Sequence, residues 1–590
     1  MTGSQIIVLA TPVFLLMIAA EHALGVARGR RVYRLNDAIS SISLGVLSQL
    51  GGLFTKVLAV GIYSLVFDAL ALWPDRAWWS TWYGVLLALV LYDFCYYWQH
   101  RAGHEVALFW AAHVVHHQSQ HYNLSTALRQ SSSGVLFGWI FYLPMALAGV
   151  PPLVFGIVAL VDLLYQFWVH TELVGKLGWF DRVFCAPSNH RVHHAINDGY
   201  LDKNYGGILI VWDRLFGSFR EEQEQCLYGT RSALRSWDPL WANTQVYWSL
   251  LQDSWRAQRW SDKVRVWFKP PGWRAPDVAL RWPKPAFDLR QVDTFDPPLD
   301  RARQWFAGSQ FLLLLGGVAM VLWFAGSWSS TQTAVCSATL LAFYWAMGAV
   351  LQGRLSIVAA LLLQSAALAT ATSALELWAW HQLFKPLTML LAMVLVVWRH
   401  LPGGTPAAHR WLLAAALMAS LAGDVFLMLP ANWFVPGLAS FLVAHLCYLR
   451  LFRAGQRWFP SRRALLGTLG FGAVMFVYLW GGLGSDTTLK IAVGAYVLVI
   501  ALMAAQAIGR ATVLRDASST AVALGACIFM ASDTLIAINR FVQPLPLAGL
   551  WVLSTYYTAQ ILIVLHVLPD NSADRRARSL PGCGPCAVTR

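Results

Sequence analysis

The stretch HRAGHEVALFWAAHVVHHQSQHYNLSTALRQS, residues 100–131, contains six of the 16 histidines of this 590-residue chain within its first 22 positions. Most of these histidines are three or four residues apart, and the same spacing returns further along the chain. The spaced groups are His100 and His104; His113, His116 and His117; and His190, His193 and His194. On a helix, residues at these spacings lie on one face about one turn apart. The spacing therefore predicts helices that direct several imidazoles the same way.

A metal site explains this pattern better than solvation does. Imidazole is the commonest nitrogen ligand for zinc, iron, copper and nickel. With His170, at the end of the apolar run LLYQFWVHTE, up to nine histidines are candidates. This number exceeds the three or four ligands of a zinc site and suits two metals. Interfacial histidines satisfied by lipid and water are the alternative, which fits lone residues such as His22 and His381 better than repeated groups.

The composition predicts an all-α polytopic membrane protein. The chain is 57% hydrophobic and 13% charged, about half the charge of an average soluble domain. Apolar runs near the roughly 20 residues that cross a bilayer recur along it. They include Gln5–Ala20, Gly84–Trp98, Phe311–Gly326, Ile357–Ala374, Trp411–Leu429, Ile491–Ile508 and Leu547–Leu568. A membrane barrel would show short alternating segments instead. Glu21 and His22 follow the first run where a signal peptide would have small residues, so we expect a retained helix.

The formal net charge of +14 does not indicate a nucleic-acid-binding protein, because of where the charge lies. Basic residues gather in short segments between apolar runs, such as RGRR at 28–31 and RWFPSRR at 457–463. Cytoplasmic loops of membrane proteins carry this excess, and it also attracts anionic lipid headgroups. We therefore predict an integral, multi-pass protein whose partner is the membrane.

Histidine usage and polarity divide the chain. Residues 1–230 hold eleven histidines and the remainder five. We predict a histidine-rich membrane domain over 1–230 with about four to six spans, and a second multi-helix transmembrane domain over 307–570 with about eight to ten. A soluble segment rich in Pro and Trp should connect them over 231–306, and a disordered tail should follow over 571–590.

The words HxxxH (100–104), HxxHH (113–117) and HxxHH (190–194) resemble the eight-histidine pattern of the membrane fatty acid hydroxylase and sterol desaturase superfamily. Within it, the flanking words look closest to the alkylglycerol monooxygenases. They are HRAGHE, FWAAHVVHH, YNLSTALRQS, QFWVHTE, APSNHRVHH and LDKNYGGILIVWDRLFGSF, between Leu91 and Phe219. Asn189 departs from the pattern, since a histidine is expected there, and His121 is an addition. Both are left outside the predicted ligand set.

The resemblance implies a di-iron centre, two irons per chain, on the cytoplasmic side of the membrane. Its ligands would be His100, His104, His113, His116, His117, His170, His190, His193 and His194. It also implies O2 as a substrate and tetrahydrobiopterin as the reductant and electron donor. The ether-linked carbon of a glycerol ether lipid would be hydroxylated, and the hemiacetal would break down to a fatty aldehyde and a glycerol derivative.

Carboxylates close to the histidines are candidates to orient the imidazole rings, as outer-shell groups do in metal sites. Asp93 lies seven residues before His100, Glu105 follows His104, and Glu172 is two residues after His170. Each could equally be a helix-end charge or a salt-bridge partner. Asp202 and Asn204, in LDKNYGG, either shape the site or only turn the chain.

The second half holds two aspartates inside apolar runs, Asp424 in LMASLAGDVFLML and Asp533 in CIFMASDTLIAINRF. A carboxylate within a membrane span is costly and is a functional candidate by default. The similar surroundings of the two favour one shared polar pocket. Lys385, His445, Tyr557 and Gln560 are further polar residues in apolar runs. The alternative is a structural hydrogen-bond network between helices.

The order KP, GD, AH-x-x-Y, SD-x-L and Y-x-x-Q resembles the lysoplasmalogenase family, over about Phe311–Leu568. This resemblance implies that Asp424 and Asp533 are an acid–base pair that hydrolyses a vinyl ether without a metal. Such hydrolysis begins with protonation of the enol ether carbon, for which a buried carboxylic acid is a suitable donor.

The sequence therefore predicts a bifunctional membrane enzyme that releases a fatty aldehyde from ether lipids. Two alternatives stay open. The first is a hydroxylase or desaturase of sterols, fatty acids or sphingolipids, with a non-catalytic second membrane domain. The second is a metal transporter, which should place ligands along several spans.

Overall fold

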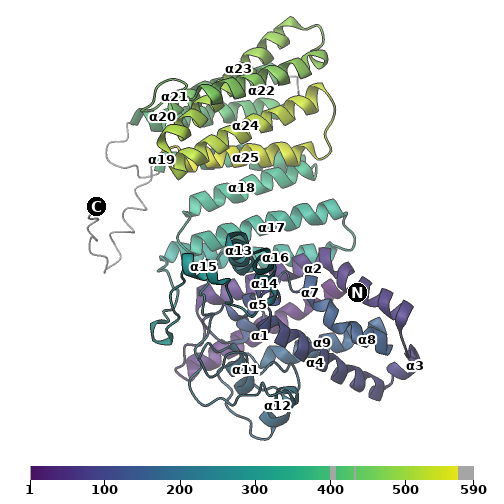
Figure 1. Ribbon diagram of the computed structural model, residues 1–590. Coiled ribbons are helices and arrows are strands. Elements are labelled where there is room, and N and C mark those ends of the chain that lie inside the picture. Colours follow the sequence, from purple (N-terminus) through teal and green to yellow (C-terminus); the bar gives the residue numbers. More distant parts are fainter. Residues whose placement is uncertain (1, 399–406, 431–432, 569–590) are drawn as a thin grey trace, which may run out of the picture. The chain divides into compact units, whose positions relative to one another are not determined.

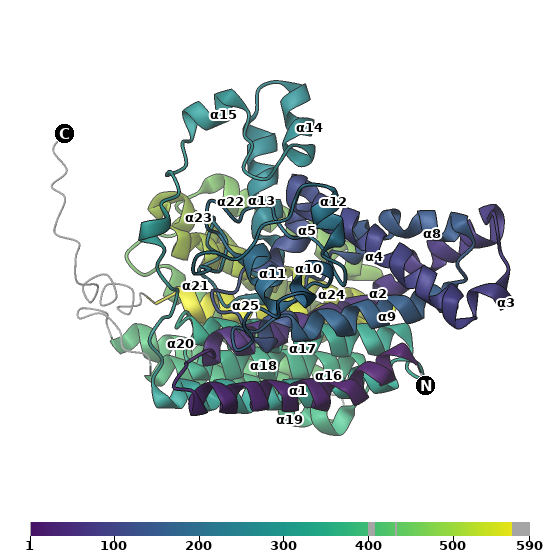
Figure 2. The same ribbon diagram turned by 90° about the horizontal axis from the view of Figure 1, so that it is seen from below.

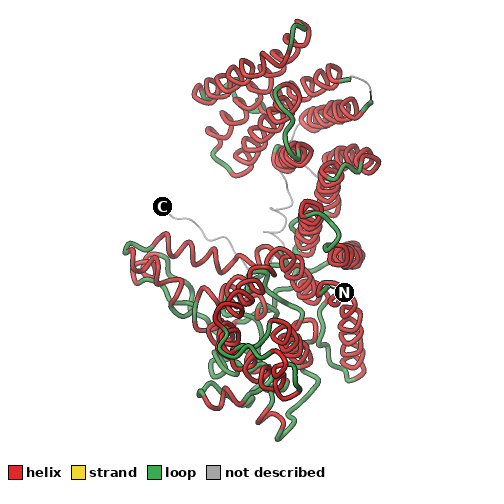
Figure 3. Tube along the Cα trace, turned by 90° about the vertical axis from the view of Figure 1, so that its right-hand side faces the viewer, coloured by secondary structure: helices red, strands yellow, loops and turns green. Residues whose placement is uncertain are grey.

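The computed structural model describes residues 2–398, 407–430 and 433–568, and within these ranges the chain is helical with no strand (Figure 3). Twelve of the described helices are long and apolar enough to cross a membrane. The prediction of an all-α polytopic membrane protein is confirmed. The predicted tail over 571–590 lies outside the described residues.

The chain forms two compact units, which are described separately. Of the described residues, unit 1 comprises 2–333 and 347–354, and unit 2 comprises 334–346 and those between 355 and 568. The division falls within helix α17 (Ser330–Leu351). The domain boundaries that the sequence suggests stay predictions.

Unit 1 contains the helices before α17 (Figure 1). They are α1 (Gly3–Ala27), α2 (Leu35–Leu70), α3 (Arg76–Trp79), α4 (Trp82–Glu105), α5 (Ala107–His117), α6 (Leu124–Ala127), α7 (Val135–Gly138), η1 (Trp139–Tyr142), α8 (Leu143–Ala148), α9 (Pro152–Trp168), α10 (Phe180–Val183), α11 (Pro187–His194), α12 (Val211–Leu215), α13 (Pro239–Arg256), α14 (Trp260–Phe268), α15 (Pro276–Arg281), η2 (Leu289–Gln291) and α16 (Arg301–Phe324).

The candidate membrane helices are unevenly distributed. Residues 1–230 hold two of the twelve, α1 and the segment Leu35–Thr55, with three shorter apolar helical segments at Val60–Leu70, Val135–Ala148 and Pro152–Trp168. The other ten follow from Arg301 onward. Helix α4, which contains the predicted run Gly84–Trp98, is not among the twelve, because its C-terminal half carries polar and charged side chains.

Helices α4 and α5 carry the first histidine words and meet at Val106, where the backbone is extended. Thr81 begins α4 by accepting a hydrogen bond from the amide of Gly84 at 3.2 Å, which satisfies a free helix-end donor. The two helices pack closely at position 103, where a Cβ would lie in van der Waals contact with the ring of His113, at 3.5 Å. The sequence thus brings the histidines of α4 against those of α5.

The segment over 231–306 is not a bare linker, because it folds into α13, α14 and α15 within unit 1. Leu250 of α13 and Val266 of α14 are buried against Ala107 and Ala111 of α5. In Figure 2 these helices lie beside the histidine-bearing part of the unit. The segment therefore packs against α5 at Ala107 and Ala111.

Unit 2 is a bundle of long helices (Figure 1). They are α18 (Ile357–Ala374), α19 (Trp378–Trp398), α20 (Ala407–Met428), α21 (Phe434–Phe452), α22 (Arg462–Leu479) with η3 (Trp480–Leu483), α23 (Thr487–Leu514), α24 (Ala517–Phe541) and α25 (Ala548–His566). Small residues allow close packing of such helices. At Gly525 of α24, a Cβ would lie 3.1 Å from the carbonyl oxygen of Ala559 on α25.

Candidate active sites

The structure brings all nine predicted histidines together in two adjacent groups. The first group is His100, His104, His113, His117 and His193, and the second group is His116, His170, His190 and His194. Within each group, one ring nitrogen per histidine lies within 4.8 Å of the others. Eight of the nine side chains are buried, and His113 is half-buried. The geometry suits two metal ions side by side.

Helices α5 and α11 each contribute to both groups. On α5, His113 and His117 belong to the first group and His116 to the second. On α11, His193 belongs to the first group, whereas His190 and His194 belong to the second. Between the groups, the rings of His117 and His194 stack with their centroids 4.3 Å apart. Each HxxHH motif therefore supplies histidines to both groups, which the spacing by itself does not reveal.

The ring nitrogens within each group are spaced like ligands of one ion. The distances between Nε2 atoms are 3.1 Å for His116–His170, 3.1 Å for His170–His190, 3.2 Å for His190–His194 and 3.1 Å for His113–His117. Two nitrogens bound at a right angle at about 2.1 Å each are about 3.0 Å apart. The Nε2 atoms of His100, His104 and His193 are buried without a hydrogen-bond partner among the described residues. Such atoms are costly unless an ion occupies the site.

The other ring nitrogen of several histidines is held by the main chain. The pairs are His100 Nδ1 with the carbonyl oxygen of Tyr205 at 2.8 Å, His116 Nδ1 with Arg129 at 2.9 Å, His170 Nδ1 with Gln166 at 2.8 Å and His193 Nδ1 with Lys203 at 3.1 Å. A carbonyl oxygen accepts from N–H, which fixes the proton on Nδ1 and leaves Nε2 free to bind metal. The orienting partners are thus backbone atoms, which residue identity cannot signal.

The carboxylates next to the histidine words have other roles. Asp93 accepts hydrogen bonds from the amides of Ile208 at 2.7 Å and Leu209 at 3.0 Å, and from Nε1 of Trp212 at 2.8 Å. It therefore holds the 205–212 loop and contacts no histidine directly. Glu105 is a salt-bridge partner of Arg101, at 3.0 Å.

The LDKNYGG segment shapes the first group. Asp202 and Asn204 have φ values of 54° and 57°, in the left-handed region that Asn and Asp tolerate best among residues with a Cβ. The fully buried Asn204 amide donates to the carbonyl oxygens of Asn189 at 3.0 Å and Arg220 at 2.7 Å. This ties the loop to α11, so that its carbonyl groups face His100 and His193.

Asp213 is a supporting residue that the sequence reasoning missed. Its carboxylate accepts from the amides of Tyr205 and Gly206, both at 2.8 Å, and from the hydroxyl of Ser218 at 2.6 Å. Burial raises the pKa of this carboxyl. Asp213 could have been found from its position in the motif WDRLFGSF. This motif resembles that of the alkylglycerol monooxygenases although it contains no histidine.

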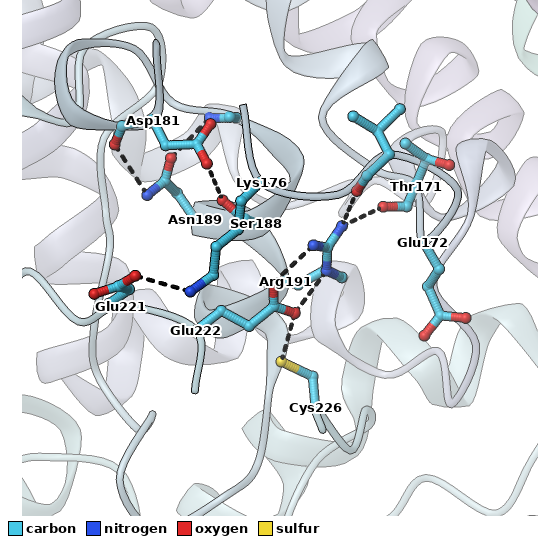
Figure 4. Close-up of polar contacts among 12 residues, drawn as sticks. Thr171, Glu172, Lys176, Asp181, Ser188, Asn189, Arg191, Glu221, Glu222 and Cys226 are labelled. Carbon is cyan, nitrogen blue, oxygen red and sulfur yellow. Dashed lines mark hydrogen bonds and ion pairs between the residues drawn. The ribbon is translucent and has the colours of Figure 1, made fainter. Parts of the chain in front are cut away.

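Arg191 joins two of the segments that carry histidines of the second group, helix α11 and the loop after His170 (Figure 4). Its guanidinium donates to both carboxylate oxygens of Glu222 at 2.7 Å, and to the carbonyl oxygens of Thr171 at 3.0 Å and Val174 at 2.8 Å. Bidentate pairs of this kind are strong and directional. The contact joins α11 to the loop that follows His170. Glu172 contributes a carbonyl oxygen, which accepts from Arg30 at 3.1 Å.

The two residues that depart from the family pattern lie outside both groups. The Asn189 side chain caps α11, accepting from the amide of Ala186 at 3.0 Å. His121 is half-buried, and its carbonyl oxygen accepts from the hydroxyl of Ser119 at 2.7 Å. Neither residue joins a metal group.

Burial keeps these imidazoles neutral. It holds the pKa of His113, His117, His190, His193 and His194 well below the ordinary value, and lowers that of His116 to about 4. A neutral imidazole is the form that binds a metal. These six histidines are therefore ready to bind a metal at neutral pH without loss of protons.

We expect Gly207→Ala to weaken the site through the loop. A Cβ at Gly207 would lie 2.8 Å from Cδ1 of Tyr96, 2.9 Å from Oδ1 of Asp162 and 3.0 Å from Oδ1 of Asp93. Overpacking of this kind costs about 1–3 kcal/mol. The apparent melting temperature in detergent should fall. Gly199→Ala is the matched control, since a Cβ there meets only Arg220, at 3.9 Å. Equal melting temperatures for the two variants would contradict this packing argument.

In unit 2, Asp424 lies in a buried polar cluster. Its carboxylate pairs with Nζ of Lys385 at 3.2 Å and accepts from the hydroxyl of Tyr556 at 2.7 Å. The amide of Gln560 donates to the hydroxyls of Ser420 at 3.2 Å and Tyr556 at 3.4 Å. Asp424 is 2% exposed, so its charge is compensated by Lys385 and not by water.

Asp533 has a different setting. Its Oδ2 accepts from the hydroxyl of Tyr496 at 2.5 Å and lies 3.3 Å from Nε2 of His445. Both Asp533 and Tyr496 line an apolar pocket whose empty space, including its mouth, is about 780 Å³. The remaining lining residues are almost all apolar, among them Phe441, Phe471 and Met475. A pocket of this size and character suits a lipid chain.

The polar pocket predicted to be shared by both aspartates stays a prediction. Asp533 lines the apolar pocket and Asp424 does not. The ring of Phe529 contacts both surroundings, with its centroid 4.7 Å from that of His445 and 5.5 Å from that of Tyr556. The two carboxylates therefore belong to neighbouring but distinct clusters.

Comparison with known proteins matches the two halves separately. The fatty acid hydroxylase family model matches residues 85–218, and the YhhN family model matches residues 380–567. Alkylglycerol monooxygenase from Homo sapiens is 41% identical over 268 residues, covering 45% of this chain and 59% of the relative. The chain thus spans a little over half of that protein. No solved structure matches the chain.

Two further relatives are covered over more of their length. Alkylglycerol monooxygenase from Danio rerio is 40% identical over 321 residues, which is 52% of this chain and 68% of the relative. Lysoplasmalogenase TMEM86B from Rattus norvegicus is 35% identical over 179 residues, which is 30% of this chain and 70% of the relative. The chain therefore belongs to the alkylglycerol monooxygenase family through its N-terminal half and to the lysoplasmalogenase family through its C-terminal half.

Proposed function

We propose that unit 1 is a membrane monooxygenase that hydroxylates the ether-linked carbon of alkylglycerol lipids. The observation that carries this proposal is the pair of all-imidazole groups, five histidines and four, with converging Nε2 atoms. Two irons would be held there, the first by His100, His104, His113, His117 and His193, and the second by His116, His170, His190 and His194.

The iron pair, when bound, would supply the redox chemistry that O2 requires. Overall, one oxygen atom enters the C–H bond beside the ether, the other leaves as water, and two electrons and two protons come from a tetrahydropterin. The hydroxylated carbon is a hemiacetal, which separates into a fatty aldehyde and glycerol without further oxidation. Backbone carbonyl groups orient the imidazole rings, and burial keeps these rings uncharged. The histidines therefore bring no negative charge to the metal site.

We place the metal groups on the cytoplasmic side of the membrane. The basic segment 28–31 lies directly against the loop after His170. Arg28 donates to the carbonyl oxygen of Leu173 at 3.2 Å, and Arg30 to that of Glu172 at 3.1 Å. Positively charged segments flanking membrane helices favour the cytoplasm. Labelling of an introduced cysteine at exposed Gly175, from inside and outside the cell, measures the orientation.

The first test is iron content together with aldehyde release. The purified protein should hold two irons per chain and release fatty aldehyde from an alkylglycerol when O2 and a tetrahydropterin are present. Iron without this activity would direct the search to sterols, fatty acids or sphingolipids, for which lipid extracts are the assay. A single tightly held zinc and no O2 dependence would overturn the proposal.

For unit 2 we propose hydrolysis of the vinyl ether bond of lysoplasmalogens. The observation in its favour is Asp533, hydrogen-bonded to Tyr496 at the wall of an apolar pocket. A protonated carboxyl there would transfer its proton to the enol ether carbon and leave an oxocarbenium ion. Water adds to that ion, and the resulting hemiacetal separates into a fatty aldehyde and a glycerophosphodiester that carries no chain. This hydrolysis requires neither a metal nor O2.

The two activities should separate under anaerobic conditions. Removal of O2, or of iron by chelation, is expected to abolish aldehyde release from alkylglycerol and to leave release from lysoplasmalogen unchanged, since only the first reaction consumes O2. Aldehyde is measured from both substrates with the same preparation. If chelation stopped both reactions equally, the assignment of two independent sites would be wrong.

A further inference from the structure

A pocket open at one side lies beside the first histidine group. It is lined by residues of α4, α5, α7 and η1, and its empty volume, including its mouth, is about 450 Å³. His100 and His113 form part of its wall, and His113 is the one half-buried histidine of that group. The space is therefore the open side of the first group.

The opposite wall is apolar. Phe109 of α5, Phe137 of α7 and Phe141 of η1 line it, and α7 and η1 belong to the apolar segment Val135–Ala148. Glycine at 134 leaves room, since a Cβ there meets nothing nearer than 3.8 Å. Such a wall suits a hydrocarbon chain that enters from the lipid phase.

Tyr96 and Gln99 are the polar residues of this lining that belong to no histidine group, and the Tyr96 hydroxyl already donates to Oε1 of Gln166 at 2.7 Å. The Oε1 atom of Gln99 is buried without a hydrogen-bond partner among the described residues, and the side chain lies beside His100 in the lining. Across the pocket it reaches Gly138, where a Cβ would lie 2.7 Å from its Nε2. A buried amide oxygen without a donor is costly, which indicates that a ligand supplies one.

We propose that this pocket binds the alkyl chain and ether end of the substrate, and that the Gln99 side chain accepts a hydrogen bond from a free glycerol hydroxyl. The inference rests on the proposed function of unit 1. The three phenylalanines hold the chain, and Gln99 holds the glycerol end. The ether-linked carbon then lies at His100 and His113, so Gln99 is a specificity residue for lipids with a hydroxyl next to the ether.

The test compares two substrates and two variants. The substrates are 1-O-hexadecylglycerol and the same ether with both hydroxyls methylated. Gln99→Leu keeps the side-chain size and removes the amide, so KM for the free diol should rise about tenfold or more. The preference for the diol over the methylated ether should disappear, while iron content stays at the wild-type value. Gln304→Leu, at an exposed position of α16, is the matched control.

A binding measurement independent of turnover completes the test. A 1-O-alkylglycerol with a photoreactive diazirine in its chain should label Phe137 or Phe141, and Gly134→Leu should suppress this labelling by filling the pocket. Turnover without labelling of these residues, and with KM unchanged in Gln99→Leu, would overturn the inference but leave the proposed function intact. Labelling without turnover would support the pocket and contradict the monooxygenase. Absence of both would overturn both.

Discussion

His116→Ala should lower the iron content from two to about one per chain and abolish aldehyde release from alkylglycerol. His116 lies in the second group, where its Nε2 is 3.1 Å from that of His170. Its loss removes one of four nitrogens from an ion that has no protein carboxylate within the group. Loss of an outer-shell partner already costs about 10–100-fold, so the loss of a direct ligand should exceed this range. Iron is measured by elemental analysis and activity by aldehyde release.

His121→Ala is the matched control for this experiment. His121 comes from the same histidine-rich stretch and is half-buried, but it belongs to neither group. It should keep two irons and the wild-type rate. If His121→Ala lost iron, or if His116→Ala kept both irons, the division of the nine histidines into two metal sites would be wrong.

Asp533→Asn should lower the rate of vinyl ether hydrolysis by about 100-fold or more, the usual contribution of a general acid. Asparagine keeps the shape of the side chain but cannot supply the proton. Because the metal groups lie in unit 1, O2-dependent cleavage of alkylglycerol should not change. Hydrolysis is followed as aldehyde release from lysoplasmalogen without O2. Tyr496→Phe, which removes the hydroxyl donated to Asp533 at 2.5 Å, should give a smaller decrease.

Asp486→Asn is the control for the second experiment. Asp486 is exposed and caps α23, accepting from the amide of Leu489 at 3.1 Å, and asparagine caps about as well. Full hydrolysis by Asp533→Asn would show that the pocket-facing carboxyl is not the acid. Asp424 is the less informative position, because its removal leaves the buried Lys385 unpaired and destabilises the bundle.

The histidine words could be found in the sequence because helical spacing and ligand chemistry are both local properties. Eight imidazoles at helical spacing, together with the lone His170, predicted a binuclear site, and the structure brings these nine together. The spacing could not assign ligands to ions. His116 and His117 are neighbours in sequence but serve different groups, because successive helical residues point about 100° apart.

The support of the site could not be foreseen in the same way. Asp93 and Glu105 were the carboxylates expected to orient the rings. The structure uses the carbonyl oxygens of Lys203 and Tyr205 instead. Any residue can present a carbonyl group, so the choice depends on a loop conformation that Asn204 and Asp213 stabilise through contacts remote in the chain.

The class of protein, the all-helical membrane fold, the nine candidate ligands and the two aspartates within apolar runs could all be read from the sequence. These features follow from composition, periodicity and residue chemistry, which are readable without contacts. Only the tertiary structure decided that Asp533 faces a pocket while Asp424 is paired with Lys385, and that Gln99 stands beside His100 in an apolar space. Those contacts depend on packing between helices far apart in the chain, and the spacing of residues along the sequence does not specify such packing.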